Sequence, residues 1–275
     1  MKKEKKVLFV RSGGGMPGLD IHIGIWRALS DAGITSTENI GTSAGAIISA
    51  LDSGGMFASE AEQRIRALSD KDVRKERFAW KLRALWVDAF LSHEPVRKLF
   101  AQLLPVGWSS LAKPLSVVAI NEHNGLVREF DPQSHVDMHN AILASMSIAG
   151  VFPPVFFPES GGRYMSDGGP IEYVPLHPNP MWFDEVWVLV ANAPYEYTPK
   201  KESVVSRFLM SMSVAIQAQI RRACRDYKLI HGEKTKVYII RPDVGRSSSC
   251  LRFDHSLIPK ARVAAAEQIR AQLSG

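Results

Sequence analysis

Three short glycine-containing segments carry the residue types that could do chemistry. In chain order they are a glycine run, a serine flanked by glycines and an acid before two glycines: Gly13–Gly18, Gly41–Gly45 and Asp167–Gly169. The serine is a candidate nucleophile, the acid is a candidate base, and the backbone N–H groups of a glycine run are candidate donors to an anion. These residue types indicate acyl transfer through a serine or the binding of a phosphate.

The serine segment, Gly41-Thr42-Ser43-Ala44-Gly45, fits the pattern G-x-S-x-G. It lies between a predicted strand, Glu38–Gly41, and a predicted helix, Ala44–Leu51, which is the context of a nucleophile elbow. Side chains in place of the two glycines would clash in so tight a turn, and the helix directs its N-terminal dipole at the serine oxygen. Ser43 is therefore the candidate nucleophile, and the plainer interpretation is a chance match.

The glycine run, Gly13-Gly14-Gly15-Met16-Pro17-Gly18, follows the predicted strand Val7–Arg11. Its backbone N–H groups can hold an oxyanion or a phosphate. The same residues satisfy G-x-G-x-x-G, and Glu38 falls about where a dinucleotide-binding fold places its ribose-binding acid. The run leaves open an oxyanion hole, a nucleotide site and a plain tight turn.

The acid segment, Ser166-Asp167-Gly168-Gly169-Pro170, follows a predicted strand, Arg163–Met165. An acid on such a tight, exposed turn is a candidate general base. Asp-Gly is also a common turn dipeptide, so the segment by itself favours a plain turn. Only its combination with the other two segments makes a catalytic role the better interpretation.

Taken in this order, the three segments resemble the patatin-like phospholipase family. Residues 144–154 add to the resemblance, because they look like the segment that precedes the catalytic acid in that family. The resemblance spans roughly residues 7–195 and implies a three-layer α/β/α fold with a mainly parallel central sheet. We expect a single domain over residues 1–275, with the helices and strand of residues 201–273 completing it.

The resemblance implies a Ser–Asp dyad that cleaves carboxylic esters of phospholipids or related acyl lipids, without a cofactor or a metal. Ser43 would carry the acyl group, and Asp167 would take and return its proton. Backbone N–H groups of Gly13, Gly14 and Gly15 would stabilise the oxyanion, with Gly14 and Gly15 the first choice. The glycines that support the elbow and the acid turn are Gly41, Gly45, Gly168 and Gly169.

The chain departs from the family's pattern in two places. The family usually has Arg or Lys just before the last glycine of its loop, where this chain has Pro17. It also tends to have Asn shortly after the acid turn, where this chain has Glu172 and Tyr173. These departures bear on the substrate and the rate, and they leave open a catalytically silent lipid-binding module.

A serine esterase of the ordinary kind would need a histidine after its acid. Three histidines come late enough in the chain: His177, His231 and His255. They keep a Ser-His-Asp triad open as an alternative, although any one histidine is more often a surface or packing residue. No histidine or cysteine spacing is typical of a metal site.

The elements that must position these residues follow from hydrophobic periodicity. Two successive strand–loop–helix units at the start of the chain predict a parallel sheet with helices on both faces. The further expected strands are Leu115–Asn121, Leu126–Phe130, Glu185–Ala191 and Lys236–Arg241. The further expected helices are Leu19–Ala32, Glu60–Leu68, Val96–Leu104, Met138–Ser147, Glu202–Leu229 and Pro259–Leu273.

Composition bounds the class of protein and its partners. With 45% hydrophobic and 23% charged residues, the chain has the balance of a globular protein, and two cysteines exclude a disulfide scaffold. No segment approaches the roughly 20 apolar residues of a membrane span, so we expect a cytoplasmic protein. The net charge of +6 permits an anionic partner.

Positive charge and aromatic residues are densest in residues 71–86, which favours contact with a membrane surface. The residues expected to make it are Arg74, Lys75, Arg77, Trp80, Lys81 and Arg83. The alternative is a solvated helix that packs its aromatic stripe on the core. No nucleic-acid-binding motif accompanies this segment, so we expect a lipid partner and no nucleic acid.

Overall fold

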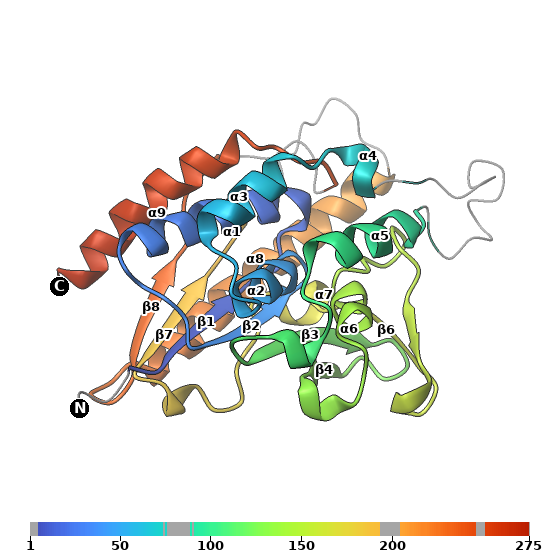
Figure 1. The fold of residues 1–275 in the computed structure, drawn as a ribbon, viewed down its shortest axis with the longest axis horizontal. Coiled ribbons are helices and arrows are strands. Elements are labelled where there is room, and N and C mark those ends of the chain that lie inside the picture. Colours follow the sequence, from blue (N-terminus) through green and yellow to red (C-terminus); the bar gives the residue numbers. More distant parts are fainter. Residues whose placement is uncertain are drawn as a thin grey trace.

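The computed structural model describes residues 5–73, 75, 89, 91–192, 204–245 and 251–274. In the described part of the chain, eight strands form one sheet (Figure 1). The strands are β1 (Val7–Arg11), β2 (Glu38–Thr42), β3 (Leu115–Asn121), β4 (Val127–Phe130), β5 (Val155–Phe157), β6 (Arg163–Asp167), β7 (Glu185–Leu189) and β8 (Lys236–Ile240).

The sheet has a parallel part and an antiparallel part. Its strand order is β5-β6-β3-β2-β1-β7-β8, and β4 pairs with β3 beside this path. The strands from β3 to β8 in this order pair in parallel, whereas β4, β5 and β6 are joined by antiparallel pairing. This arrangement confirms the mixed α/β fold with a mainly parallel sheet, and the antiparallel pairing of β6 with β3 and β5 is what the sequence did not indicate.

Helices cover both faces of the sheet (Figure 1). One face carries α1 (Gly15–Asp31), α2 (Ala44–Ser53), α3 (Ala58–Arg66), α4 (Asp70–Val73), α5 (Glu94–Leu103), α6 (Met138–Ser145) and α9 (Leu257–Leu273). The other face carries α7 (Gly169–Glu172) and α8 (Val204–Ile230). In β1, Phe9 packs toward the first face and Val10 toward the second, because successive side chains of a strand alternate. Burial on both faces explains why β1 and β7 are nearly continuous apolar runs.

Two boundaries differ from the sequence prediction in ways that matter for the site. Helix α1 begins at Gly15 rather than Leu19, so Pro17 lies in its first turn. Proline fits there because the first N–H groups of a helix have no acceptor within it. Strand β6 continues to Asp167, which therefore lies in the ladder rather than on an exposed turn.

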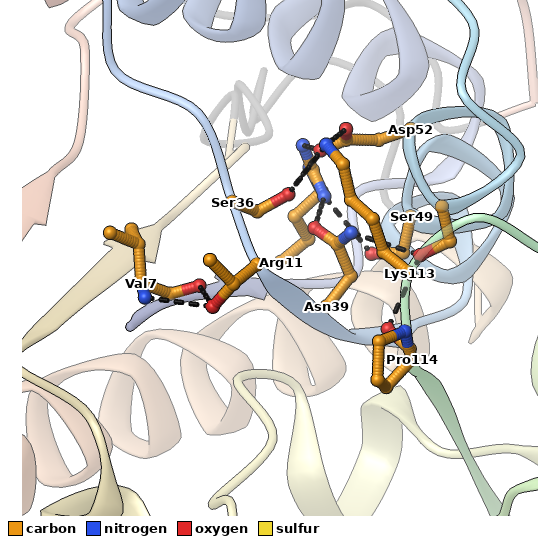
Figure 2. Close-up of polar contacts among 10 residues, drawn as sticks. Val7, Arg11, Ser36, Asn39, Ser49, Asp52, Lys113 and Pro114 are labelled. Atoms are coloured by element: carbon orange, nitrogen blue, oxygen red, sulfur yellow. Dashed lines mark hydrogen bonds and ion pairs between the residues drawn. The ribbon is translucent and has the colours of Figure 1, made fainter. Parts of the chain in front are cut away.

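A buried charged network ties β1 to α2 (Figure 2). Arg11, which is fully buried at the end of β1, donates to Asp52 Oδ2 at 2.7 Å and to Asn39 Oδ1 at 2.5 Å. Lys113 Nζ donates to the second carboxylate oxygen of Asp52 at 2.7 Å. Burial by itself raises the pKa of Asp52, but Arg11 and Lys113 outweigh it and hold this pKa below its usual range. The network therefore needs Asp52 ionised.

Replacing Asp52 should test how far the fold depends on this network. Asp52→Ala leaves the Arg11 charge buried without its counter-ion, so we expect the free energy of unfolding in urea to fall by about 3–5 kcal/mol. Glu60→Ala, which breaks an exposed ion pair with Arg64, should cost less than about 1 kcal/mol. Because the folded pKa of Asp52 is depressed, its contribution is complete above about pH 4 and is lost as the pH falls further. Equal losses in the two variants would contradict this prediction.

Candidate active site

The carboxyl ends of β2 and β6 meet on one edge of β3. Thr42, the last residue of β2, pairs with Val118, and Asp167, the last residue of β6, pairs with the next residue of β3, Ala119. Strand β4 pairs with residues 117–120 and therefore occupies the opposite edge. Since β2 runs parallel to β3 and β6 runs antiparallel to it, the two strands point at each other. This register brings the residue after β2 to the last residue of β6.

Ser43 and Asp167 are in direct contact at this junction. Ser43 Oγ donates to Asp167 Oδ2 at 2.7 Å, and the two residues are only 5% and 4% exposed. The other carboxylate oxygen of Asp167, Oδ1, accepts the Gly169 N–H at 2.6 Å. The Gly169 N–H thus orients the carboxylate so that Oδ2 faces the Ser43 hydroxyl. A proton can pass directly between these two groups.

Ser43 occupies a strained turn. Its backbone has φ 54° and ψ −122°, in the region of positive φ that costs a residue other than glycine about 1–3 kcal/mol. A Cβ on Gly41 would lie 2.5 Å from the Gly45 carbonyl oxygen, and a Cβ on Gly45 would lie 2.5 Å from the Ser12 carbonyl oxygen. The two glycines of the motif therefore let β2, α2 and the end of β1 pack this closely.

The glycine run is held by Ser12 and Tyr173. Ser12 Oγ accepts the Ala191 N–H at 2.9 Å and donates to the Gly13 carbonyl at 2.8 Å. The Gly13 N–H donates to the Tyr173 carbonyl at 2.8 Å, so it is not free to bind an oxyanion. Within the described part of the chain, the Gly14 and Gly15 N–H groups have no backbone acceptor. Because N–H and C=O point in opposite directions across a trans peptide, the Gly14 N–H points away from Ser12 Oγ.

The electrostatics of Asp167 differ from those of a surface carboxylate. Burial raises its pKa from 3.8 to about 6, and the hydrogen bonds from Gly169 and Ser43 lower it by less. A carboxylate with a raised pKa is a stronger base than an ordinary one and is still ionised near neutral pH. This combination suits a group that takes a proton from a hydroxyl.

Ser145 is a residue of this site that the motifs did not reveal. Its hydroxyl, at the end of α6, accepts the Ser43 N–H at 2.8 Å and donates to the Val118 carbonyl at 2.5 Å. Two residues later, the Ser147 carbonyl accepts the Asp167 N–H at 3.0 Å. Ser145 is 102 residues from Ser43 in the chain, so no local spacing connects the two. The only sequence signal was the family resemblance of residues 144–154.

The late histidines make their contacts elsewhere. His177 Nε2 lies 3.3 Å from Glu38 Oε1, His231 bonds to the backbone of Val237, and His255 Nδ1 lies 2.7 Å from Asp20 Oδ1. Among the hydrogen bonds of the described residues, none joins these histidines to the Ser43–Asp167 pair. The geometry favours a dyad over a triad.

Glu38 is poorly placed for a nucleotide site. It begins β2, whereas the glycine run follows the carboxyl end of the neighbouring strand β1. At about 3.3 Å of rise per residue, Glu38 lies about 13 Å from the carboxyl end of its strand. A ribose-binding acid belongs at the same edge of the sheet as the glycine loop. The register therefore argues against the dinucleotide alternative.

The residues at which the chain departs from the family's pattern make defined contacts near the site. Pro17 is buried in the first turn of α1. Glu172 accepts the Leu176 N–H on its carboxylate at 2.6 Å, and its carbonyl accepts the Thr42 hydroxyl at 3.1 Å. The ring of Tyr173 lies against Gly13, where an added Cβ would be 3.1 Å from it. These residues shape the turns around the Ser43–Asp167 pair.

Most of the expected membrane contact cannot be placed. Lys75 is described and forms an exposed ion pair with Glu94. The other residues, Arg74, Arg77, Trp80, Lys81 and Arg83, lie outside the described residues. No helix in the described ranges is both long and apolar enough to cross a bilayer.

Comparison with known proteins identifies the family and the fold. A family model described as patatin-like phospholipase matches residues 9–180. The lysophospholipase NTE1 of Mycosarcoma maydis is 27% identical over 183 residues, which are 61% of this chain and 8% of that protein, so the chain spans a small part of its length. The crystal structure of VipD from Legionella pneumophila shares the fold, with a TM-score of 0.58 and 15% identity over 98% of this chain and 67% of VipD.

The raised pKa of Asp167 predicts a stability cost that can be measured. Above about pH 6 folding buries a charged carboxylate, whereas below about pH 4 the group is protonated in both states. Asp167→Asn should therefore raise the free energy of unfolding by about 1–3 kcal/mol at pH 8 and by much less at pH 4. Urea unfolding at both pH values measures this, with Asp31→Asn, at an exposed ion pair with Arg262, as the control. A variant less stable than the wild type at pH 8 would count against the assigned cause.

Proposed function

The chain belongs to the patatin-like phospholipase family, and from that premise we propose that it hydrolyses carboxylic esters of acyl lipids with Ser43 and Asp167. The observation that carries the proposal is the 2.7 Å hydrogen bond from the Ser43 hydroxyl to the Asp167 carboxylate, in a strained strand-to-helix turn. The substrate class is phospholipid or lysophospholipid. The lysophospholipase name of a relative supports the second, but that relative is far longer than this chain.

In the acylation step, Ser43 Oγ attacks the ester carbonyl carbon while Asp167 Oδ2 takes the hydroxyl proton. The carbonyl oxygen becomes an oxyanion, which the Gly14 and Gly15 N–H groups bind. When the intermediate collapses, the bond to the leaving alcohol breaks and Asp167 returns the proton to that alcohol. The acyl group stays on Ser43 as an ester.

Water completes the cycle through the same groups. Asp167 takes a proton from water, whose oxygen attacks the acyl carbon, and the glycine N–H groups bind the second oxyanion. The bond to Ser43 Oγ then breaks, and the proton held by Asp167 returns to that oxygen. The products are a fatty acid and the free enzyme. Each oxyanion donor of this kind typically contributes about 100- to 1,000-fold in rate.

Membrane contact and the number of domains are also part of the proposal. We expect peripheral contact with anionic lipid through the basic residues of segment 71–86, most of which lie outside the described residues. We also propose that residues 1–275 form one domain, because strands from both ends of the chain join one sheet. Pro17 fits the helix start, which counts against a distorted loop as the reason for a silent lipid-binding module.

Replacing either member of the dyad should remove activity without unfolding the protein. Ser43→Ala and Asp167→Asn should each lower kcat by about 10⁴-fold or more, as in other enzymes whose nucleophile and base act together. Mass spectrometry of lipid products from mixed phospholipid membranes measures the loss and identifies the ester that is cleaved. Ser30→Ala and Asp31→Asn, at the exposed end of α1, are the matched controls. Hydrolysis at the wild-type rate in either dyad variant would refute the mechanism.

The pH dependence of ester hydrolysis should follow the ionisation of Asp167. Because the base must be ionised, kcat/KM for a soluble short-chain ester should fall tenfold per pH unit below about pH 6. The same limb should remain when His177, His231 or His255 is replaced by Gln, since the Ser43 hydroxyl already donates to a carboxylate. Loss of the limb in one histidine variant would instead favour a triad.

A further inference from the structure

The Ser145 hydroxyl lies at the junction where the ends of β2 and β6 meet. Both strands end here: Thr42 of β2 pairs with Val118 and Asp167 of β6 pairs with Ala119, so neither ladder continues along this edge of β3. A Cβ on Gly168 would lie 3.1 Å from the Val118 carbonyl oxygen, so this carbonyl faces the junction. The Ser43 N–H opens onto the same junction. The hydroxyl of Ser145, which is fully buried, is hydrogen-bonded to both groups.

The direction of these bonds leaves the hydroxyl little freedom. Its proton goes to the Val118 carbonyl, so its oxygen must accept from the Ser43 N–H. A serine hydroxyl has one proton to donate and lone pairs that accept. It can therefore satisfy the Val118 carbonyl and the Ser43 N–H at the same time. Alanine would leave a buried N–H and a buried carbonyl without these partners.

We propose that Ser145 is a positioning residue that holds Ser43 in its reactive, strained conformation; this inference rests on the proposed function of Ser43 and Asp167. The bond fixes the plane of the peptide before Ser43, and φ then sets where Oγ points relative to that plane. With the bond in place, φ is held at 54° and Oγ meets Asp167 Oδ2. Without it, the turn relaxes toward negative φ and Oγ moves off the carboxylate.

Ser53 provides a matched control at the other end of the same strand pair. Its hydroxyl is also buried, accepts from Asn39 Nδ2 at 2.9 Å and donates to the Pro114 carbonyl at 3.4 Å. Ser53→Ala therefore removes the same kind of bridge far from Ser43. It should lower stability while leaving catalysis within about threefold of the wild type.

For Ser145→Ala we expect kcat to fall about 100-fold with KM nearly unchanged, which is the scale of an ångström-sized misplacement of a reacting atom. Labelling of Ser43 by a fluorophosphonate should slow in proportion. The acid limb should stay at or above pH 6, because Ser145 does not touch Asp167 and the loss of the Ser43 hydrogen bond raises the pKa of Asp167. Ser145→Thr, which keeps the hydroxyl, should recover most of the rate. If the alanine variant does not fold, Ser145→Cys keeps the volume with a much weaker donor and should show the same loss.

Three results would overturn the proposal: a kcat for Ser145→Ala within about threefold of the wild type, an equal loss in Ser53→Ala, or an acid limb shifted toward pH 4, which would mean a generally opened site. A crystal structure of Ser145→Ala separates this inference from the proposed function. If φ of Ser43 stays near 54°, the positioning role fails even when the wild type hydrolyses lipids. If φ relaxes, it stands even when lipid hydrolysis is not found.

Discussion

The candidate site depends on the meeting of two strand ends on one edge of β3. Strand β2 approaches from one end and β6 from the other, and their last residues pair with two adjacent residues of β3, Val118 and Ala119. Ser43 turns away into α2 at this point, and Asp167 ends the opposing strand. The hydrogen bond between them is therefore a consequence of strand pairing over many residues, which makes it rigid. Such rigidity suits a base that must face its nucleophile before substrate arrives.

Two buried acids of this structure lie in opposite electrostatic environments. Asp52 is held by Arg11 and Lys113, and its pKa lies below the usual range. Asp167 is equally buried but bonds only to neutral donors, so its pKa lies well above that range. The first arrangement stabilises the packing of α2 on β1. The second costs stability and, in the proposed mechanism, provides the base, which is the trade expected at a functional site.

Contacts with neighbouring residues reduce the number of available N–H groups in the glycine run. All three glycines were candidate oxyanion donors, yet the Gly13 N–H is taken by the Tyr173 carbonyl. The acceptor is a backbone carbonyl in the turn that follows Asp167. The loop is therefore joined to the turn after the acid, and among its glycines only Gly14 and Gly15 have N–H groups without a backbone acceptor in the described part of the chain.

The sequence by itself determined the local features: the strand-to-helix turn at Ser43, the glycines that it needs and most of the strands and helices. These follow from spacing over a few residues, because tight turns and amphipathic periods are written locally. Only the tertiary structure decided that Asp167 reaches Ser43 across 124 residues, that β6 runs antiparallel, and that Ser145 closes the junction. Strand register and partner choice are non-local, so no pattern within one segment could specify them.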